Sequence, residues 1–282
     1  MMLVCGGCQF SVNALAPNGL GQSDLGVGGD LATVDTDLAA NDLAPGPDIA
    51  DPCGTPPALG AGNIAAQCVI GSPPTIDGDL SDWTAASLAG FTHVSAAQST
   101  GAWDPVEATN DGDSSARFFV KWDLNYLYIA AAISDDIRET PNNTGPGLTD
   151  NDALEIFLDG AHNRTQAYDS TDWQLIISAD NKKAAFQNAV AKTFPSGIMF
   201  ALGGASPSWN VEVAIPWASV GGSGTIGRVL GFDIKLDDND SGNTTRDRGL
   251  VMYYTAVGAG SPPCSALYCR TDSFGAVQLQ GR

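Results

Sequence analysis

The sequence predicts an all-β protein: an antiparallel two-sheet β-sandwich (jelly-roll or immunoglobulin-like) with about ten strands and little helix. The segment WNVEVAIPW at 209–217 carries an apolar residue at every second position, as a strand with one buried face requires. The segments ALEIFLDG at 153–160 and VLGFDIKLDD at 229–238 alternate in the same way. Turns rich in Gly, Asn and Asp separate these segments, and no long helical periodicity interrupts them.

Shorter alternating segments supply the remaining strands. They are expected at 117–123, 126–135, 173–180, 184–188, 198–203, 250–254 and 274–280. The residues DLN at 123–125 form a short hairpin connection between the first two. Strands of this length with one apolar face pack as two sheets around a common core, so one domain is predicted over 69–282.

Composition limits the classes of partner. The chain has 282 residues, 43% of them hydrophobic, which is enough for a core of ordinary size. Its formal net charge is −19, and so acidic a surface repels phosphates, so no nucleic acid partner is expected. No apolar run reaches the ~18 residues that a membrane span needs. This charge suits cations, solubility outside the cell, or neutral ligands such as sugars.

Residues 1–22 are interpreted as a truncated signal with a lipoprotein-like start. Two glycines precede Cys8 in MMLVCGGCQF, as in a bacterial lipoprotein signal, and Cys8 is the candidate lipidation site. Cys5, the missing basic region and the very short apolar region fit this pattern poorly. The alternative is an unprocessed N-terminus. The lipid-anchor hypothesis places the protein outside the cell or on its surface, attached to the outer membrane.

Residues 23–68 are predicted to be a disordered acidic tether. Asp-Leu pairs recur at irregular intervals between Ala, Gly and Pro, and no aromatic residue occurs between 23 and 51. Such a segment cannot bury enough apolar surface to offset its ordering entropy. It would link an anchor to the folded domain.

The six cysteines form three pairs of near neighbours: Cys5 with Cys8, Cys53 with Cys68, and Cys264 with Cys269. In an exported protein the last two pairs are interpreted as local disulfides. The alternative is free, buried thiols in a cytosolic protein.

Six sequence blocks together carry a family resemblance. They are, in order, IDGDLSDW, VKWDLNYLYIAAAISD, DNDALEIFLD, WNVEVAIPW, GFDIKLDDND and a terminal FGAVQL. This series resembles carbohydrate-binding module family 9, a β-sandwich often attached to polysaccharide-degrading enzymes. The similarity covers about 69–280. No block is specific alone, and their order indicates the fold more strongly than it indicates sugar binding.

The resemblance implies a sugar site that this chain keeps only in part. Family members hold a terminal sugar between two tryptophans and hydrogen-bond its hydroxyls with polar side chains. The family's glutamate corresponds to Glu155, a family glutamine to Lys235, and one clamp tryptophan to Tyr268. The second clamp tryptophan falls at Thr149 and an arginine at Ile176, so both are lost. Glu155 could equally belong to a solvated acidic edge.

Other aromatic residues could replace the missing clamp. Trp103, in the Gly- and Pro-flanked TGAWDPVE, and Trp173 are the candidates; otherwise the ligand differs or the site is inactive. The remaining tryptophans are predicted to be core residues. They are Trp122, Trp209 and Trp217 on apolar strand faces, and Trp83, which follows the turn IDG and would plug one end of the sandwich.

Two acidic groups are candidate calcium sites. The loop DDNDSG places Asp237, Asn239 and Ser241 at alternate positions before a glycine, like the first half of an EF-hand loop. Arg248 stands where the bidentate glutamate should be, so a full EF-hand is excluded, and a polar β-turn is the alternative. The second group, Asp135 and Asp152 with neighbouring Asp136 and Asp150, lies at strand ends that could converge. Structural calcium is therefore expected.

Catalysis has little support in the sequence. There are two histidines and no HExxH or GxSxG motif. We therefore expect a non-catalytic, monomeric module that binds an oligo- or polysaccharide. The alternatives are a glycoside hydrolase-associated domain, a surface lipoprotein that binds another protein, and a haem-binding sandwich. The candidate axial ligands for haem are Met199, Met252, Lys235, His93 and His162.

Overall fold

The computed structural model describes residues 53–55, 57–83, 92–94, 109–188, 190–245, 248–251 and 270–281. All of them belong to one compact unit, residues 48–282. The N-terminal segment 1–22 and most of the predicted tether lie outside the described residues.

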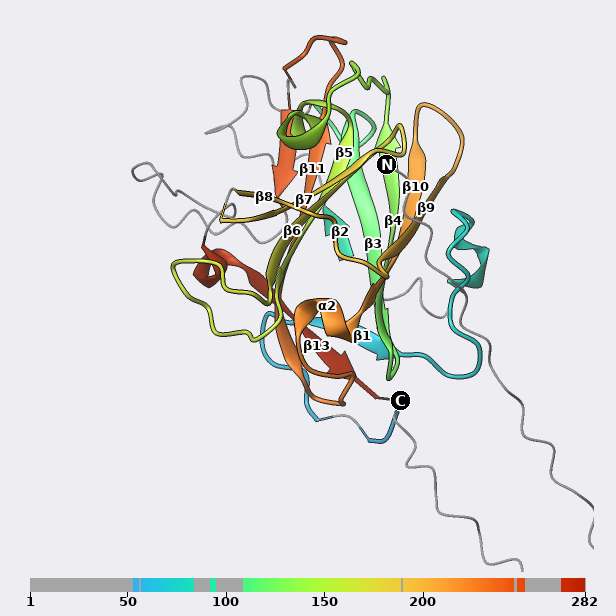
Figure 1. Ribbon diagram of the computed structural model, residues 1–282. Coiled ribbons are helices and arrows are strands. Elements are labelled where there is room, and N and C mark those ends of the chain that lie inside the picture. The colour runs from blue at the N-terminus through green and yellow to red at the C-terminus, as the bar shows by residue number, and fades with distance from the viewer. Residues whose placement is uncertain are drawn as a thin grey trace, which may run out of the picture. The chain divides into compact units, whose positions relative to one another are not determined.

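The described chain is nearly all β, which confirms the predicted fold class (Figure 1). Its short helical segments are η1 (Leu80–Asp82), η3 (Gly145–Asp150), α2 (Trp217–Val220) and η4 (Thr271–Ser273). The strands are β1 (Ile64–Cys68), β2 (Thr92–Val94), β3 (Ser114–Trp122), β4 (Tyr126–Asp135), β5 (Ala153–Asp159), β6 (Asp172–Ser178), β7 (Lys183–Gln187), β8 (Val190–Lys192), β9 (Met199–Gly203), β10 (Trp209–Pro216), β11 (Val229–Asp238), β12 (Arg248–Val251) and β13 (Gly275–Gln280).

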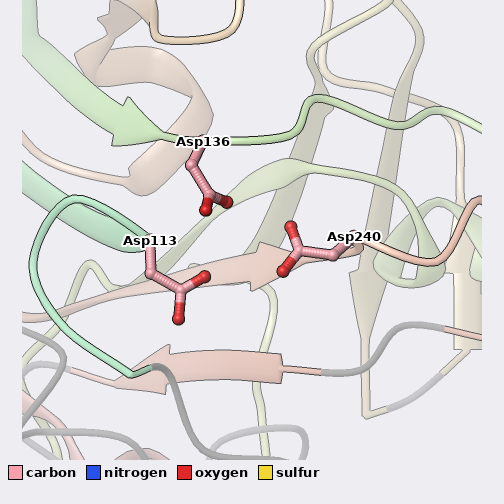
Figure 2. A group of neighbouring side chains, drawn as sticks. All are labelled: Asp113, Asp136 and Asp240. Carbon is pink, nitrogen blue, oxygen red and sulfur yellow. The ribbon is translucent and has the colours of Figure 1, made fainter.

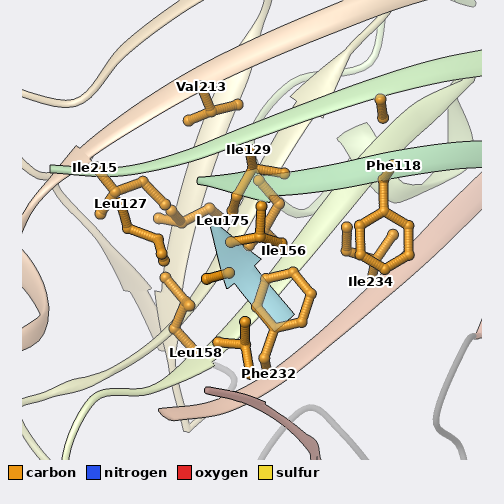
Figure 3. Close-up of a cluster of buried hydrophobic side chains, with 14 of the residues drawn as sticks. Phe118, Leu127, Ile129, Ile156, Leu158, Leu175, Val213, Ile215, Phe232 and Ile234 are labelled. Carbon is orange, nitrogen blue, oxygen red and sulfur yellow. The ribbon is translucent and has the colours of Figure 1, made fainter. Parts of the chain in front are cut away.

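One continuous hydrogen-bonded path runs through the strands in the order β8-β7-β6-β5-β11-β13-β1-β3-β4-β10-β9. The path folds back on itself, because β3 and β11, which are not neighbours along it, face each other across the core. The rings of Phe118 on β3 and Phe232 on β11 lie 6.0 Å apart. Figure 3 shows Ile156 and Leu175 from one half of the sheet close to Ile129 from the other. This is the predicted sandwich.

The core follows the period-two pattern of the sequence. It includes the even positions of β5 and β11 and the odd positions of β4 and β10, such as Ile156, Ile234, Ile129 and Val213. Trp122, Trp209 and Trp217 are all buried, as predicted. The outward positions of these strands are therefore the ones left for ligands or for other covering segments.

β1 differs from the prediction in two ways. It lies inside the segment 23–68 that was predicted to be a tether, and it pairs in parallel with both β13 and β3. Its last residue, Cys68, forms a disulfide with Cys53 across a Cα–Cα distance of 5.5 Å. The folded part therefore begins before residue 69.

The segment IDGDLSDW covers the outer face of β3, β4 and β10. Trp83 is 1% exposed and packs in a second apolar cluster with Phe119, Tyr128 and Ala214. The prediction that Trp83 is buried is confirmed, but it lies on the outside of a sheet and not at the end of the sandwich. At Gly78 the backbone of this segment comes close to the backbone of β9. Its φ is +89°, and a Cβ there would lie 2.4 Å from the Leu202 carbonyl oxygen, so glycine is required.

Two carboxyl groups are buried side by side where β5 ends and β6 begins. Asp159 and Asp172 are cross-strand partners, and both are fully buried. Asp159 accepts hydrogen bonds from the backbone N–H groups of Arg164 at 2.9 Å and Asn163 at 3.2 Å. Asp172 accepts one from Asp169 at 2.7 Å. Burial, reinforced by the nearby Asp159 charge, raises the pKa of Asp172 to about 7.

This carboxyl pair predicts a pH-dependent stability. Between the ordinary aspartate pKa and about 7, the unfolded chain releases a proton that folded Asp172 keeps, so stability falls as pH rises through this window. In Asp172→Asn the free energy of unfolding should depend less on pH. At pH 8 it should exceed that of the unaltered protein by at least ~1 kcal/mol. Urea unfolding at pH 4.5, 6 and 8 measures it. Equal slopes for the two proteins would contradict the assignment.

Candidate functional site

The outer face of β6, β5 and β11 carries a buried polar network, so Glu155 does not belong to a solvated acidic edge, which was the alternative to a sugar contact. Glu155 on β5 and Lys235 on β11 are direct cross-strand partners, so their side chains leave the sheet on the same side. Asp237 lies two residues after Lys235 on the same face of β11. Gln174 on β6 pairs with Phe157, two residues along β5 from Glu155, and so also lies on this face. Their odd or even positions put all four opposite the core.

The four side chains are joined by hydrogen bonds and ion pairs. The Lys235 ammonium donates to Glu155 Oε1 at 3.0 Å and to Asp237 Oδ1. Gln174 Nε2 donates to the other carboxylate oxygen, Glu155 Oε2, at 2.5 Å. Glu155 thus has both oxygens engaged, and one cation is shared by two carboxylates.

This network is buried. Glu155 is 0% exposed and Lys235 2% exposed. Charges that are taken out of water are a net benefit to stability only when their geometry is good, and an apolar set of similar volume would often be as stable. A buried, cross-linked set of this kind holds its donors and acceptors in one fixed arrangement on the outer sheet face.

The neighbouring part of this face is apolar. Ile176, at the position where the resemblance implies an arginine, is buried with Leu148 and Phe186. Leu148 comes from η3, which also contains Thr149, where the resemblance implies a tryptophan. The Thr149 hydroxyl donates to the Pro146 carbonyl at 3.0 Å within this turn. The two positions that differ from the family pattern, Ile176 and Thr149, therefore lie close together. In place of an arginine and a tryptophan, this chain has an apolar contact between the sheet and the turn η3.

Trp173 does not join this network. It shares the inward face of β6 with Leu175, packs against the core, and donates from its indole nitrogen to the Ser219 carbonyl at 2.8 Å. It therefore lies on the opposite side of the sheet from Glu155. Trp103 and Tyr268, the other predicted aromatic contacts, lie outside the described residues, as do Cys8, Cys264 and Cys269.

A second set of charged groups gathers at one end of the sandwich. Asp135, Asp238 and Asp240 present carboxylate oxygens within 4.8 Å of one another, and so do Asp113, Asp136 and Asp240. Figure 2 shows the carboxylates of the latter three turned toward a common space. We call these five residues the aspartate cluster. Asp240 belongs to both triads.

The strand pattern explains how the aspartate cluster forms. Asp135 continues the inward row of β4 after Ile133, and Asp238 continues the inward row of β11 after Leu236. The two strands belong to opposite halves of the sandwich, so their inward rows meet where the core ends. Burial is the main reason that the pKa of Asp135 is raised to about 7.

Four of the five predicted calcium ligands have other roles here. Asp237 points to the outer face and pairs with Lys235. The Asn239 side-chain oxygen accepts from the Ser241 N–H and hydroxyl, both at 3.1 Å, so these two residues close the loop. The Asp152 carboxylate accepts from two backbone N–H groups, those of Glu139 and Asn239. Burial, with Asp135 next in effect, raises the pKa of Asp152 to about 9.

The remaining predicted ligand, Asp135, belongs to the aspartate cluster. The structure adds Asp238 and Asp240, which directly follow the predicted ligands Asp237 and Asn239, and Asp113 from the turn before β3. It also adds Gln174 to the Glu155 network. Alternation along β11 already contained the first signal, because the residue after an inward Leu236 and an outward Asp237 must point inward.

The fold and the Glu155 network define a class: a β-sandwich with a buried polar network on one outer sheet face. The family model of "Carbohydrate family 9 binding domain-like" proteins matches residues 89–282. The chain belongs to this family. None of the helices in the described residues is long and apolar enough to cross a membrane.

The chain matches a small part of several larger enzymes. The chain is 26% identical over 220 residues to exoglucanase XynX of Acetivibrio thermocellus, which covers 77% of this chain and 17% of the relative. It is 29% identical over 170 residues to endo-1,4-beta-xylanase A of Thermotoga maritima, covering 60% and 14%. The match thus spans under a fifth of these enzymes.

Solved structures share the fold. A family 9 carbohydrate-binding module from Caldicellulosiruptor kristjanssonii, in complex with cellotriose, superposes with a TM-score of 0.58 at 20% identity, covering 78% of this chain and 94% of that one. The same module in complex with glucose gives 0.57, also at 20% identity, covering 77% and 96%. At this identity the likeness concerns the fold alone.

Proposed function

We propose that the chain is a non-catalytic module that binds an oligo- or polysaccharide. The observation that carries the proposal is the buried Lys235–Glu155–Gln174 network on the outer sheet face of a chain in this family. Its fold neighbour from C. kristjanssonii is described with cellotriose and with glucose. The xylanase and exoglucanase relatives support a role in the recognition or breakdown of polysaccharide.

The chemistry of the network suits sugar hydroxyls. A hydroxyl both donates and accepts, so it can take the place of one present partner of the Lys235 ammonium or of a Glu155 carboxylate oxygen. Charged partners make these hydrogen bonds stronger than neutral ones. The aromatic contribution is assigned to Tyr268 and Trp103, whose rings would stack on the apolar faces of a pyranose. Trp173 faces the core and is not part of this site.

A titration of the full chain with cellotriose, xylotriose and glucose tests this function. Glu155→Gln and Lys235→Met should each weaken binding of the best of these sugars at least tenfold, because one buried partner then loses its charge-assisted hydrogen bond. Lys192→Met is the matched control, since Lys192 is exposed on β8. It should bind as the unaltered protein does.

Two outcomes would count against this function. One is the absence of binding to all three sugars by protein that circular dichroism shows to be folded. The other is binding that Glu155→Gln and Lys235→Met leave unchanged, which would move the site elsewhere. The haem alternative would give an absorbance band near 400 nm; of its candidate ligands, Lys235 is engaged in ion pairs and Met199 is exposed on β9.

The aspartate cluster is proposed to hold structural calcium. Its donors are hard carboxylate oxygens from three separate chain segments, and Ca²⁺ prefers such oxygens. Asp135 and Asp238 are buried, so a cation would offset repulsion that water does not screen. Bound there, calcium would fasten the ends of β4 and β11 and the turn before β3. It supplies no catalytic chemistry in this role.

The setting proposed for the module is extracellular. The Cys53–Cys68 disulfide suits an oxidising compartment. Lipidation at Cys8, a tether that places the module away from the outer membrane, a Cys264–Cys269 bridge and a monomeric state complete the proposal. Fatty-acid labelling that is lost in Cys8→Ser tests the anchor.

A further inference from the structure

A cavity separate from the Glu155 network lies on the opposite half of the sandwich. It has a volume of about 500 Å³ and is bounded by the end of β1, by Lys121 on β3, by residues 69–75 and by Asp82. Ligand pockets for small molecules are typically about 300–1,000 Å³. The cavity thus has the size for one or two sugar rings.

Lys121 lines this cavity with an ammonium group whose hydrogen-bond donors are only partly used by the protein. Its ammonium lies 4.7 Å from the centre of the Trp83 ring, and within the described residues it has one hydrogen bond, to the Asp82 carbonyl at 3.5 Å. An ammonium has three donors, so at least two remain for a ligand. Burial lowers the pKa of Lys121, which fits a group partly withdrawn from water.

Asp82 provides a matching acceptor. Its Oδ2 accepts from the Thr75 N–H at 2.7 Å. No ion pair within 4.0 Å joins Lys121 to Asp82 in the part of the chain that the structure describes. A donor and an acceptor that lie near each other without pairing can be bridged by adjacent hydroxyls. The Asp82 charge and the net charge of −19 both disfavour an anionic ligand.

Part of the cavity wall is apolar, and the end of β1 that bounds the cavity is held in place. Ile70, which is 63% exposed, lines the cavity together with Pro73 and Pro74, and these side chains give the C–H face of a pyranose a surface to pack on. Val69 N–H donates to the Trp122 carbonyl at 2.8 Å, and the disulfide at Cys68 holds the end of β1. The edge of the site formed by β1 is therefore ordered before a ligand binds, which lowers the entropy lost there on binding.

We propose that this cavity is a second sugar-binding site, which takes a neutral pyranose through two adjacent hydroxyls held by Lys121 and Asp82. The inference does not depend on the Glu155 network. A chain with two sugar sites on opposite sheet faces would engage two chains, or two parts of one chain, of a polysaccharide and gain avidity.

Amide and indole NMR spectra of the full ¹⁵N-labelled chain test the second site, with glucose, galactose, xylotriose and cellotriose as probes. The expected result is a saturable shift at Ile70, Thr75, Lys121 and the Trp83 indole N–H with at least one probe. Lys121→Met should weaken that titration at least tenfold, whereas Glu155→Gln and the control Lys192→Met should leave it unchanged.

The two proposed sites fail separately in this experiment. Saturable shifts confined to the strands around Glu155 would overturn the second site and leave the proposed function standing. The second site would also be overturned if the shifts at Ile70 and Thr75 saturated at the same sugar concentration in Lys121→Met as in the unaltered protein. Shifts at the cavity alone would support the second site and count against the Glu155 network.

Discussion

Replacing Glu212 by alanine is expected to lower the free energy of unfolding by ~3–5 kcal/mol. Glu212 is fully buried on β10 and is the common acceptor for the segment that covers the outer face of β3, β4 and β10. Its carboxylate accepts from the Trp83 indole at 2.6 Å and from the N–H groups of Gly78 at 2.6 Å and Asp77 at 3.0 Å. Alanine leaves all three donors without this acceptor. Urea unfolding measures the loss.

Trp83→Phe provides the graded control for this prediction. Phenylalanine keeps most of the apolar packing against Phe119 but removes one of the three donors to Glu212. We expect it to lower the free energy of unfolding by ~1–2 kcal/mol, clearly less than Glu212→Ala. A Glu212→Ala protein within 1 kcal/mol of the unaltered one would show that the segment is held mainly by its apolar contacts.

Strands whose pattern is local could be predicted from the sequence. The expected segment 126–135 is the extent of β4, and 209–217 differs from β10 by one residue. β1, in contrast, was assigned to the tether. Its sequence IAAQC is short, and its partners are β13, far away at the end of the chain, and β3. Long-range pairing of this kind leaves no signal in a short segment.

The candidate site could be predicted only where residues match a known pattern. Glu155 and Lys235 followed from the family resemblance, and the structure brings them together as cross-strand partners. Gln174 was missed because its contact with Glu155 depends on the register of β6 against β5, which the sequence does not state. The EF-hand-like pattern at 237–242 misled for a different reason. It favoured Asp237, although alternation along β11 makes Asp238 the inward residue.

Calcium should raise the Tm of the chelator-treated full chain by about 5–10 °C at a concentration near 100 times its dissociation constant. The reason is that the folded aspartate cluster gathers five carboxylates, whereas the unfolded chain disperses them and binds the ion weakly. Differential scanning calorimetry with EDTA and then with excess CaCl₂ measures the shift. An unchanged Tm would contradict structural calcium at this end of the sandwich.

Asp240→Asn is the decisive variant for this prediction, since Asp240 belongs to both triads of the aspartate cluster. It should abolish most of the calcium-induced rise. In EDTA it should also melt higher than the unaltered protein, because one like charge is removed from a crowded group. Asp180→Asn removes the same charge from the surface pair with Lys182 and should keep the full calcium response. If both variants respond alike, the effect is one of net charge and not of a site. Asp240→Asn should therefore have a higher Tm than the unaltered protein in EDTA and a lower Tm with calcium. This reversal is expected if the carboxylates of the cluster repel one another until a cation binds between them.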